Sequence, residues 1–295
     1  MRGELLALLA ALAFALSIVY SRRFMVPGHS AGGPVAPEVG VFVSMLSNVV
    51  VFGGLAVWEI ARGSHRLLTA HAVVFFVLGG VAGTFIGRNL AYQSVLRIGP
   101  SRSTAIRLSN TLFAVLVGLV FLRELPRALQ LAGAALVTAG LWLVVSRERQ
   151  QQSRVDGLGV LAALASAVAF AVGDSLRRAG LSLTPSPVLG AAIGASVAFL
   201  GQATWLSVRM PRFPRRELGN RDVLISALSN TAAILLLFMA LQRSPVANVS
   251  ALYNLQVLLV IFLSRRLLPV DEEIGVRVAV GSVTSLLGSL AILFG

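Results

Sequence analysis

Ten stretches of about 20 apolar residues follow one another along this 295-residue chain. A helix needs about 20 apolar residues to cross a bilayer, and a soluble globule of this size could not hide so many of them. The composition agrees, because 56% of the residues are hydrophobic and 13% are charged. We therefore predict an all-α integral membrane protein. Its ten transmembrane helices are expected over residues 4–21, 39–58, 72–96, 101–122, 128–146, 157–176, 188–208, 222–242, 246–265 and 274–294.

The charges are mostly positive and lie mainly between the apolar stretches. Arginine supplies all 25 basic residues against 12 acids, which gives a net charge of +13. In a soluble protein this balance would suggest a nucleic-acid partner, but no contiguous basic face or aromatic platform accompanies it. Arginines at helix ends instead contact anionic lipid headgroups. We therefore expect the lipid bilayer as a partner, and no nucleic acid.

Groups suited to catalysis are scarce. The chain has no cysteine, which excludes disulfides, thiolate metal sites and cysteine nucleophiles. Its three histidines, His29, His65 and His71, fall in or beside connectors, and no zinc-protease, serine-hydrolase or P-loop motif occurs. We therefore predict that the protein is not an enzyme and has no catalytic residue, no metal and no cofactor.

The chain contains an internal repeat. The segment LAALAFALSIVYSRR, which ends at Arg23, resembles LASAVAFAVGDSLRR, which ends at Arg178. Pro100 before the fourth stretch corresponds to Pro245 before the ninth. In the fifth and tenth stretches, the matching glycines are Gly133 with Gly281 and Gly140 with Gly288.

This repeat divides the chain into two five-helix units, residues 1–150 and 151–295. Because five is odd, the second unit must enter the membrane in the opposite sense, which makes the repeat inverted. Inverted repeats are a mark of transporters, whose binding site lies near the bilayer midplane between the repeats. The first stretch could be mistaken for a signal peptide, but its counterpart inside the chain favours its retention.

The order of these stretches resembles the ten-helix, EamA-like branch of the drug/metabolite transporter superfamily. The residues that carry the resemblance are AYQSVLRIGPSRSTAIRLSNTLFAVLVGLVFLRELPRALQLAGAALVTAGLWLV and the weaker echo ALQRSPVANVSALYNLQVLLVIFLSRRLLP. Glu124 in LRELP, followed by GAALVTAG, is similar to the usual end of a repeat in this family, whereas the second half has the arginines of SRRLLP there. The resemblance implies a carrier that moves small metabolites, often outward, through a central cavity.

Two arginines lie inside apolar stretches, Arg88 in the third and Arg107 in the fourth. A charge at the bilayer centre costs about 2.5–3.5 kcal/mol on insertion scales, so such residues are functional candidates. The two are about equally far from the turn at Pro100 and should therefore lie at similar depth. Together they could bind a carboxylate or phosphate in a bidentate manner. The alternative is that each side chain snorkels to the membrane interface.

Polar side chains near these arginines are candidates for lining the same cavity. Amides and phenols can orient a ligand without the cost of a net charge. The alternative role for each is a hydrogen bond between helices. The predicted cavity residues are Arg88, Asn89, Tyr92, Arg107, Asn110, Tyr253, Asn254 and Gln256, and Asn48 and Asn230 are weaker candidates.

Asp174 is the one acid well inside an apolar stretch, near the end of the sixth. A lone carboxylate at such a place is a candidate for proton coupling. Arg177 and Arg178 follow at i+3 and i+4, so a local ion pair is the simpler expectation.

Small residues recur at every fourth position along two stretches, and such stripes allow helices to approach closely in lipid. They are Gly79, Gly83 and Gly87 in the third stretch and Gly190, Gly194 and Ala198 in the seventh.

The sequence thus predicts a multi-pass protein of the cell membrane. Its expected function is secondary transport, in the export direction, of a small organic metabolite such as an amino acid or organic anion. The alternative functions are a non-catalytic membrane subunit or scaffold and a membrane-embedded enzyme. For the assembly, a homodimer is the alternative to a monomer. For orientation, connector arginines number eight on the side of the termini and fifteen on the other. The positive-inside rule then places the termini outside, whereas the family resemblance implies cytoplasmic termini.

Overall fold

A computed structural model describes residues 2–28, 33–62, 68–117, 127–145, 156–209, 215–241, 252–268 and 275–294. Throughout these residues the regular secondary structure is helical. The first half contains α1 (Arg2–Met25), α2 (Pro37–Ala61), α3 (Ala70–Gly79), η2 (Gly80–Gly87), α4 (Arg88–Ile98), α5 (Pro100–Arg107), α6 (Asn110–Val117) and α7 (Ala128–Val145). The second half contains α8 (Gly157–Leu183), α9 (Pro187–Arg209), α10 (Arg215–Leu218), α11 (Arg221–Leu241), α13 (Gln256–Leu267) and α14 (Val276–Phe294).

Local sequence signals begin and end several of these helices. Pro37 and Pro100 occupy the first turns of α2 and α5, where a missing N–H costs nothing. Asp156 caps α8 by accepting a hydrogen bond from the Leu158 N–H at 2.9 Å. Between α4 and α5, Gly99 adopts a φ of 82°, a conformation open to glycine that turns the chain back into the bundle.

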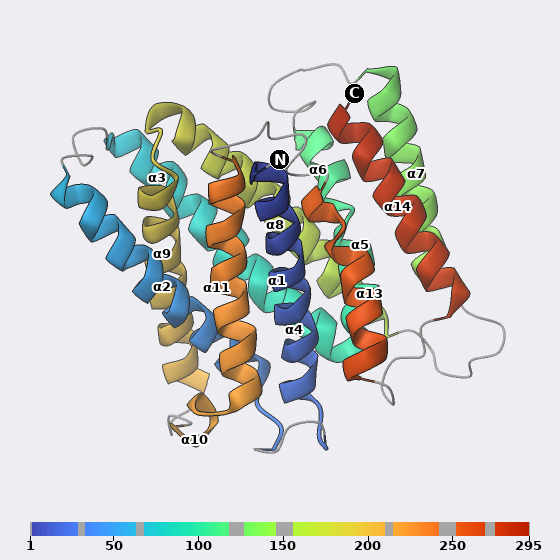
Figure 1. Ribbon diagram of the computed structural model, residues 1–295, viewed down its shortest axis with the longest axis horizontal. Helices are drawn as coiled ribbons and strands as arrows, with labels where there is room; N and C mark the ends of the chain where they lie inside the picture. The colour runs from blue at the N-terminus through green and yellow to red at the C-terminus, as the bar shows by residue number, and fades with distance from the viewer. Residues whose placement is uncertain are drawn as a thin grey trace.

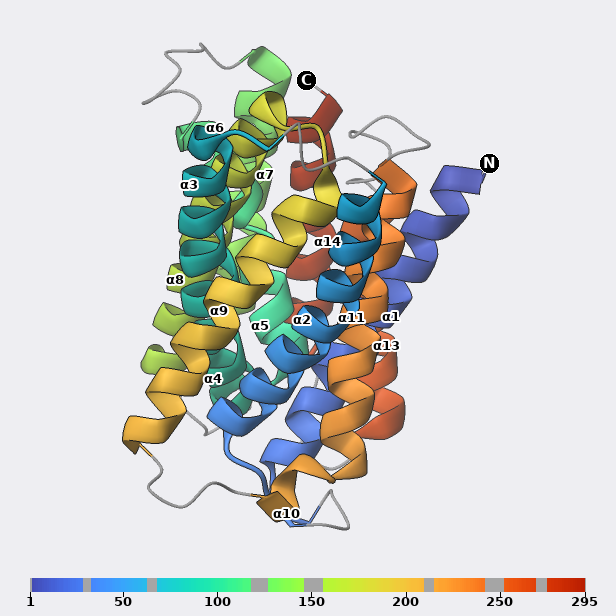
Figure 2. The same ribbon diagram turned by 90° about the vertical axis from the view of Figure 1, so that its left-hand side faces the viewer.

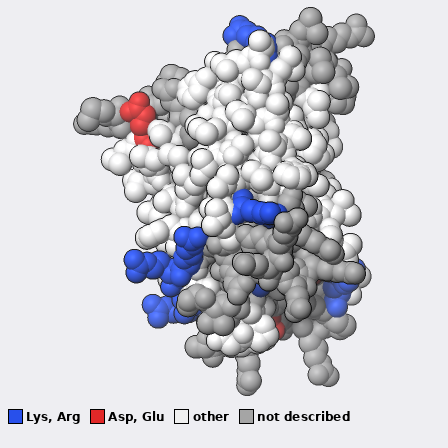
Figure 3. All heavy atoms as spheres, turned by 90° about the vertical axis from the view of Figure 1, so that its right-hand side faces the viewer, with Lys and Arg blue, Asp and Glu red and all other residues white. Residues whose placement is uncertain are grey.

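The described helices form a bundle in which most helices run up and down the view, and both chain ends lie on its upper side (Figures 1 and 2). Within the described residues, six helical segments, one of them the continuous run Ala70–Ile98, are long and apolar enough to cross a membrane. Figure 3 shows one flank of the bundle, where uncharged atoms predominate and arginines gather toward the lower end. The exposed arginines at helix ends include Arg97, Arg265, Arg266 and Arg277. The protein is therefore a multi-pass membrane protein with an apolar belt.

Each main helix contact joins one half of the chain to the other. Helix α1 packs on α11, α2 on α9, α7 on α14, and α5 on α13, while α8 packs along α3, η2 and α4. If each helix is replaced by its counterpart in the other half, the same set of helix contacts results. This is expected of a structure built from two repeats.

The pair α7 and α14 shows the relative sense of the two halves. A Cβ atom placed on Gly133 would lie 2.6 Å from the carbonyl oxygen of Gly288. A Cβ atom placed on Gly140 would lie 2.5 Å from that of Gly281. Because the sequence numbers of the contacting glycines run in opposite directions, these two corresponding helices are antiparallel.

The third span departs from a regular α-helix. The sequence predicts one helix over 72–96, but the span winds as a π-helix from Gly80 to Gly87. Glycines of this segment meet glycines of its neighbours: a Cβ atom on Gly80 would lie 2.7 Å from the Gly194 Cα, and one on Gly173 would lie 2.7 Å from the Gly83 Cα. The predicted small-residue stripes are thus places of close packing, and the widened turn lies at their crossing point.

The prediction of one unbroken helix over 101–122 is wrong. Helix α5 ends at Arg107 and α6 begins at Asn110, with Leu108 and Ser109 between them. The chain tightens here through i to i−3 hydrogen bonds, from Leu108 N to Ala105 O and from Ser109 N to Ile106 O. The polar side chains of Ser109 and Asn110 offer the backbone local alternatives to helical bonding, which favours a break.

A similar break occurs in the second half. Helix α13 begins only at Gln256, and Leu255 N donates to Leu252 O in the same i to i−3 pattern. The first residues of the predicted ninth span, with Pro245, lie outside the described residues, as does Glu124.

Candidate functional site

A cavity of about 700 Å³ lies between the two halves of the chain. Both helix breaks face it, through Leu108 and Asn110 on one side and Asn254 and Gln256 on the other. Helices from both halves contribute side chains, including α1, α2, α4, α8, α9 and α11. The site is therefore shared between the repeats.

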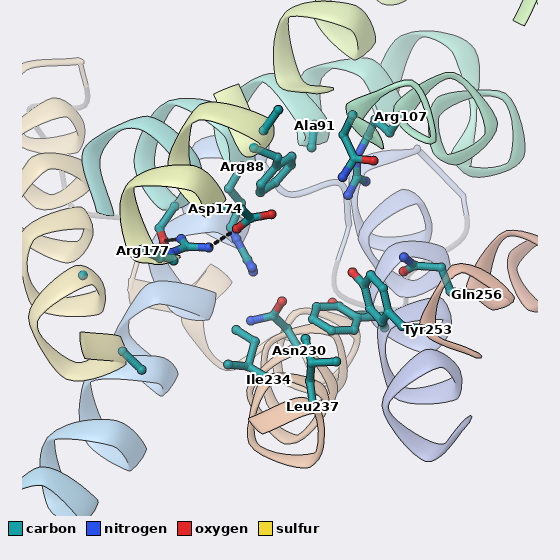
Figure 4. A pocket seen from close by; sticks show the side chains of 18 of the residues that line it. Arg88, Ala91, Arg107, Asp174, Arg177, Asn230, Ile234, Leu237, Tyr253 and Gln256 are labelled. Atoms are coloured by element: carbon teal, nitrogen blue, oxygen red, sulfur yellow. Dashed lines mark hydrogen bonds and ion pairs between the residues drawn. The ribbon is translucent and has the colours of Figure 1, made fainter. Parts of the chain in front are cut away.

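Arg88 begins α4 directly after the π-helical segment, and its side chain lines the cavity (Figure 4). Its Nη1 atom donates a hydrogen bond to the Ser44 hydroxyl of α2 at 2.8 Å. Its Nε atom is buried and has no hydrogen-bond partner within the described residues. Among the described residues, the guanidinium is thus held by a neutral group that leaves its charge uncompensated.

Arg107 ends α5 and also lines the cavity, from the edge of the break in the fourth span. Its guanidinium carbon lies 5.1 Å from the centroid of the Phe170 ring, a distance that allows a cation–π interaction. No carboxylate of the described chain forms an ion pair with Arg107, and its Nε atom also lacks a hydrogen-bond partner there. The structure thus brings the two predicted arginines into one cavity.

Most of the other predicted residues line the cavity as well. They are Tyr92, Asn110, Tyr253, Asn254 and Gln256, with the weaker candidates Asn48 and Asn230. Asn254 is partly engaged, since its Nδ2 atom donates to the Ser289 hydroxyl at 2.8 Å. The Oε1 atom of Gln256 is buried, with no hydrogen-bond partner among the described residues.

Asn89 is the exception and lies away from the cavity. Its Nδ2 atom donates to Gln202 Oε1 of α9 and to the Phe85 carbonyl, both at 2.8 Å. Arg88 and Tyr92 are four positions apart and share a helix face, whereas Asn89 is turned by about 100° from Arg88. Asn89 therefore joins helices, which is the alternative role considered for these amides.

Asp174 pairs with Arg177, as the spacing predicts, with 2.8 Å between its Oδ1 and the arginine Nη1. The other nitrogen, Nη2, donates to the Thr84 hydroxyl of the π-helical segment at 2.6 Å. Both side chains line the cavity, so the pair belongs to the site as well as to the helix (Figure 4). The sequence predicts this ion pair but gives no sign that it lines the cavity.

Aromatic lining residues were also missed. Phe14 and Phe52 line the cavity from α1 and α2, and Phe170 lines it from α8. Phe170 precedes Asp174 and Arg177 by four and seven positions, so the three share one face of α8. This spacing could have indicated from the sequence that Phe170 lies beside the Asp174–Arg177 pair.

Comparison with known proteins agrees with this architecture. The model of the EamA-like transporter family matches the chain twice, over residues 1–146 and 157–294. The chain belongs to the EamA-like transporter family. A solved structure described only as "Crystal structure of protein" shares 19% sequence identity, covers 98% of this chain and 95% of its own, and superposes with a TM-score of 0.57, which shows the common fold. No curated protein sequence matches the chain.

Among the described residues, the lining of the cavity in this EamA-like protein reaches one end of the bundle. Its lining extends to Leu181, Pro187 and Leu293, which lie near the helix ends on the side of the chain termini. In the opposite direction, the deepest lining residues include Ser21 and Val95.

Below these residues the bundle is closed by packed side chains and hydrogen bonds. A core cluster containing Phe24, Val39 and Tyr92 fills this end. The Arg22 Nη1 atom donates to the carbonyls of Val95 and Leu96 at the end of α4. Further contacts across the closed end are Arg23 with Asp222 at 3.3 Å and Gln93 with Glu38 at 3.3 Å.

Proposed function

We propose that this member of a transporter family is a secondary transporter, working outward, that carries a small organic metabolite by alternating access. Its ten spans form two inverted five-helix repeats in the cell membrane, and the substrate occupies the cavity between them. The observation that carries the proposal is a cavity open at one end of the bundle, closed at the other, and bordered by a helix break from each half. Interrupted helices at a repeat interface are typical of transporter binding sites.

Alternating access requires the closed end to open while the other end closes. Besides the apolar core cluster, several polar contacts between side chains or from side chains to carbonyls hold the closed end, and such contacts can exchange with water. The glycine crossings of η2 with α8 and α9 lack interlocking side chains, so they permit these helices to slide. The contacts at the closed end can therefore act as a gate, and the glycine crossings provide the surfaces along which helices move.

Single-cysteine labelling tests this proposal, because the native chain contains no cysteine. Ser175→Cys probes the open cavity, and Ser226→Cys probes the closed end, where Ser226 is 1% exposed. Each variant is labelled with a membrane-impermeant maleimide in right-side-out and in inside-out vesicles, with the native protein as the unlabelled control. We expect the two cysteines to react from opposite sides of the membrane. Lasting protection of Ser226→Cys from both sides would contradict alternating access.

A further inference from the structure

The charges that line the cavity do not balance. Four arginines line it, Arg88, Arg107, Arg177 and Arg178, but Asp174 is the one acid among the described lining residues. Asp174 is already bonded to Arg177, which Thr84 also holds. Arg88 and Arg107 therefore remain without a counter-charge in this part of the chain, and as like charges in one cavity they repel each other.

An anion bound in the cavity that both arginines line would relieve this imbalance. Uncompensated charge inside a membrane protein is costly, so a bound anion gains more there than it would in water. Both arginines line the cavity, and guanidinium donors match the geometry of a carboxylate. Each also has a buried Nε atom without a hydrogen-bond partner among the described residues, so neither guanidinium is fully satisfied by this part of the chain. Ser44 fixes Arg88 and Phe170 supports Arg107, so much of the ordering cost is met before a ligand arrives.

The rest of the cavity is mainly apolar. Figure 4 shows Arg88, Arg107 and the Asp174–Arg177 pair on one side, with Ile234, Leu237 and Tyr253 across from them. A further aromatic surface is formed by Phe14, whose ring stacks edge-on with Tyr253 at a centroid distance of 5.1 Å. A small inorganic anion would leave this wall in contact with water. An organic anion with an apolar body would cover it, at about 25 cal/mol per Å² of apolar surface removed from water.

We propose that the cavity binds an amphipathic organic monocarboxylate, with its carboxylate on Arg107 and Arg88 and its apolar body against Phe14 and Tyr253. The inference rests on the proposed function, since the bound carboxylate is the transported substrate. A zwitterion is disfavoured because its ammonium group would need a free acid, and Asp174 is engaged by Arg177. The cavity volume of about 700 Å³ is large enough for such a molecule together with water.

Isothermal titration of the detergent-purified full chain tests the proposal with four probes. 3-Phenylpropionate carries both features, acetate lacks the body, 3-phenylpropylamine reverses the charge, and phenylalanine adds an ammonium group. We expect 3-phenylpropionate to bind at least tenfold more tightly than each of the other three. Equal affinity for acetate, or tighter binding of the amine or the amino acid, would overturn the proposal.

Matched variants locate the binding groups. Arg107→Gln should weaken 3-phenylpropionate binding at least tenfold, whereas Arg102→Gln, in the same helix but outside the cavity lining, should leave it unchanged. Arg107→Lys keeps the charge and should retain part of the affinity even where Arg107→Gln folds poorly. Phe14→Ala should weaken 3-phenylpropionate and spare acetate. Equal losses in the Arg102 and Arg107 variants would overturn the assignment of the site.

These results separate the two proposals. Tight binding of 3-phenylpropionate without movement across a membrane would contradict transport and uphold the binding site. Transport of another class of compound without carboxylate binding would uphold the transporter and overturn the substrate class.

Discussion

Arg22 and Arg177 hold equivalent positions in the repeated segments that end at Arg23 and Arg178, yet they have different partners. Arg22 donates to the carbonyls of Val95 and Leu96 at the closed end of the bundle. Arg177 instead bonds Asp174 and Thr84 beside the open cavity. The two repeats thus share a fold but differ in the contacts of one arginine, as expected when one end is closed and the other open.

Replacing Arg22 tests its part in closing the bundle. Arg22→Ala removes the bonds to the end of α4, so we expect a cysteine at Ser226 to be labelled severalfold faster in this background. The matched control is Arg97→Ala, which removes an ion pair with Asp156 near the same end but outside the core cluster. Unchanged labelling with Arg22→Ala would show that apolar packing alone closes this end.

Asp174 has two candidate roles, counter-ion of Arg177 and proton carrier. Because its carboxylate is bonded to Arg177, we expect Asp174→Asn to add one positive charge to the cavity and to strengthen 3-phenylpropionate binding severalfold. The measurement is titration at low ionic strength, alongside the pH dependence of transport. Loss of that pH dependence in Asp174→Asn would assign proton coupling to Asp174 instead.

The connector before α8 should give the protein a sensitivity to acid. The hydrogen bond from Arg97 and those from the backbone at the start of α8 hold the pKa of Asp156 below its usual value. A carboxyl group whose pKa is lowered by folding stabilises the folded state above its unfolded pKa, and loses that contribution as pH falls through the folded value. We expect the melting temperature of the native chain to fall on acidification below about pH 4, and Asp156→Asn to reduce that dependence. An identical pH profile in Asp156→Asn would contradict this origin.

The crossing of α7 and α14 depends on the absence of side chains. In Gly140→Ala the new Cβ would lie 2.5 Å from the Gly281 carbonyl oxygen, so the helices must separate. We expect a destabilisation of about 1–3 kcal/mol, seen as a lower melting temperature. Gly54→Ala in α2 is the control, because nothing lies within 4 Å of its Cβ position. A matching loss in both variants would indicate a general intolerance of alanine rather than close packing.

Much of this architecture could be predicted from the sequence because lipid imposes long apolar helices. The predicted stretches coincide with the described helices to within a few residues over most of the chain, apart from the breaks. The glycines that the repeat matches, Gly133 with Gly281 and Gly140 with Gly288, all lie at the contact between α7 and α14, where Gly133 meets Gly288 and Gly140 meets Gly281. Arg88 and Arg107 could be found because a charge inside an apolar stretch is conspicuous.

The remaining features depend on tertiary contacts that no local pattern records. The π-helical turn from Gly80 to Gly87 occurs where three helices cross, and apolar composition alone does not distinguish it from an α-helix. The position of Asn89 depends on which face of α4 meets Gln202. The closed end depends on side chains from α1, α2, α4 and α11 that are far apart in sequence.

Counterflow in proteoliposomes tests the central claim most directly. Vesicles that contain the purified protein are loaded with unlabelled 3-phenylpropionate and diluted into a trace of the labelled compound. We predict transient, saturable accumulation of label by the native chain and by Arg102→Gln, and at least a tenfold lower rate with Arg107→Gln. Binding of the carboxylate without any counterflow in the native chain would contradict the account.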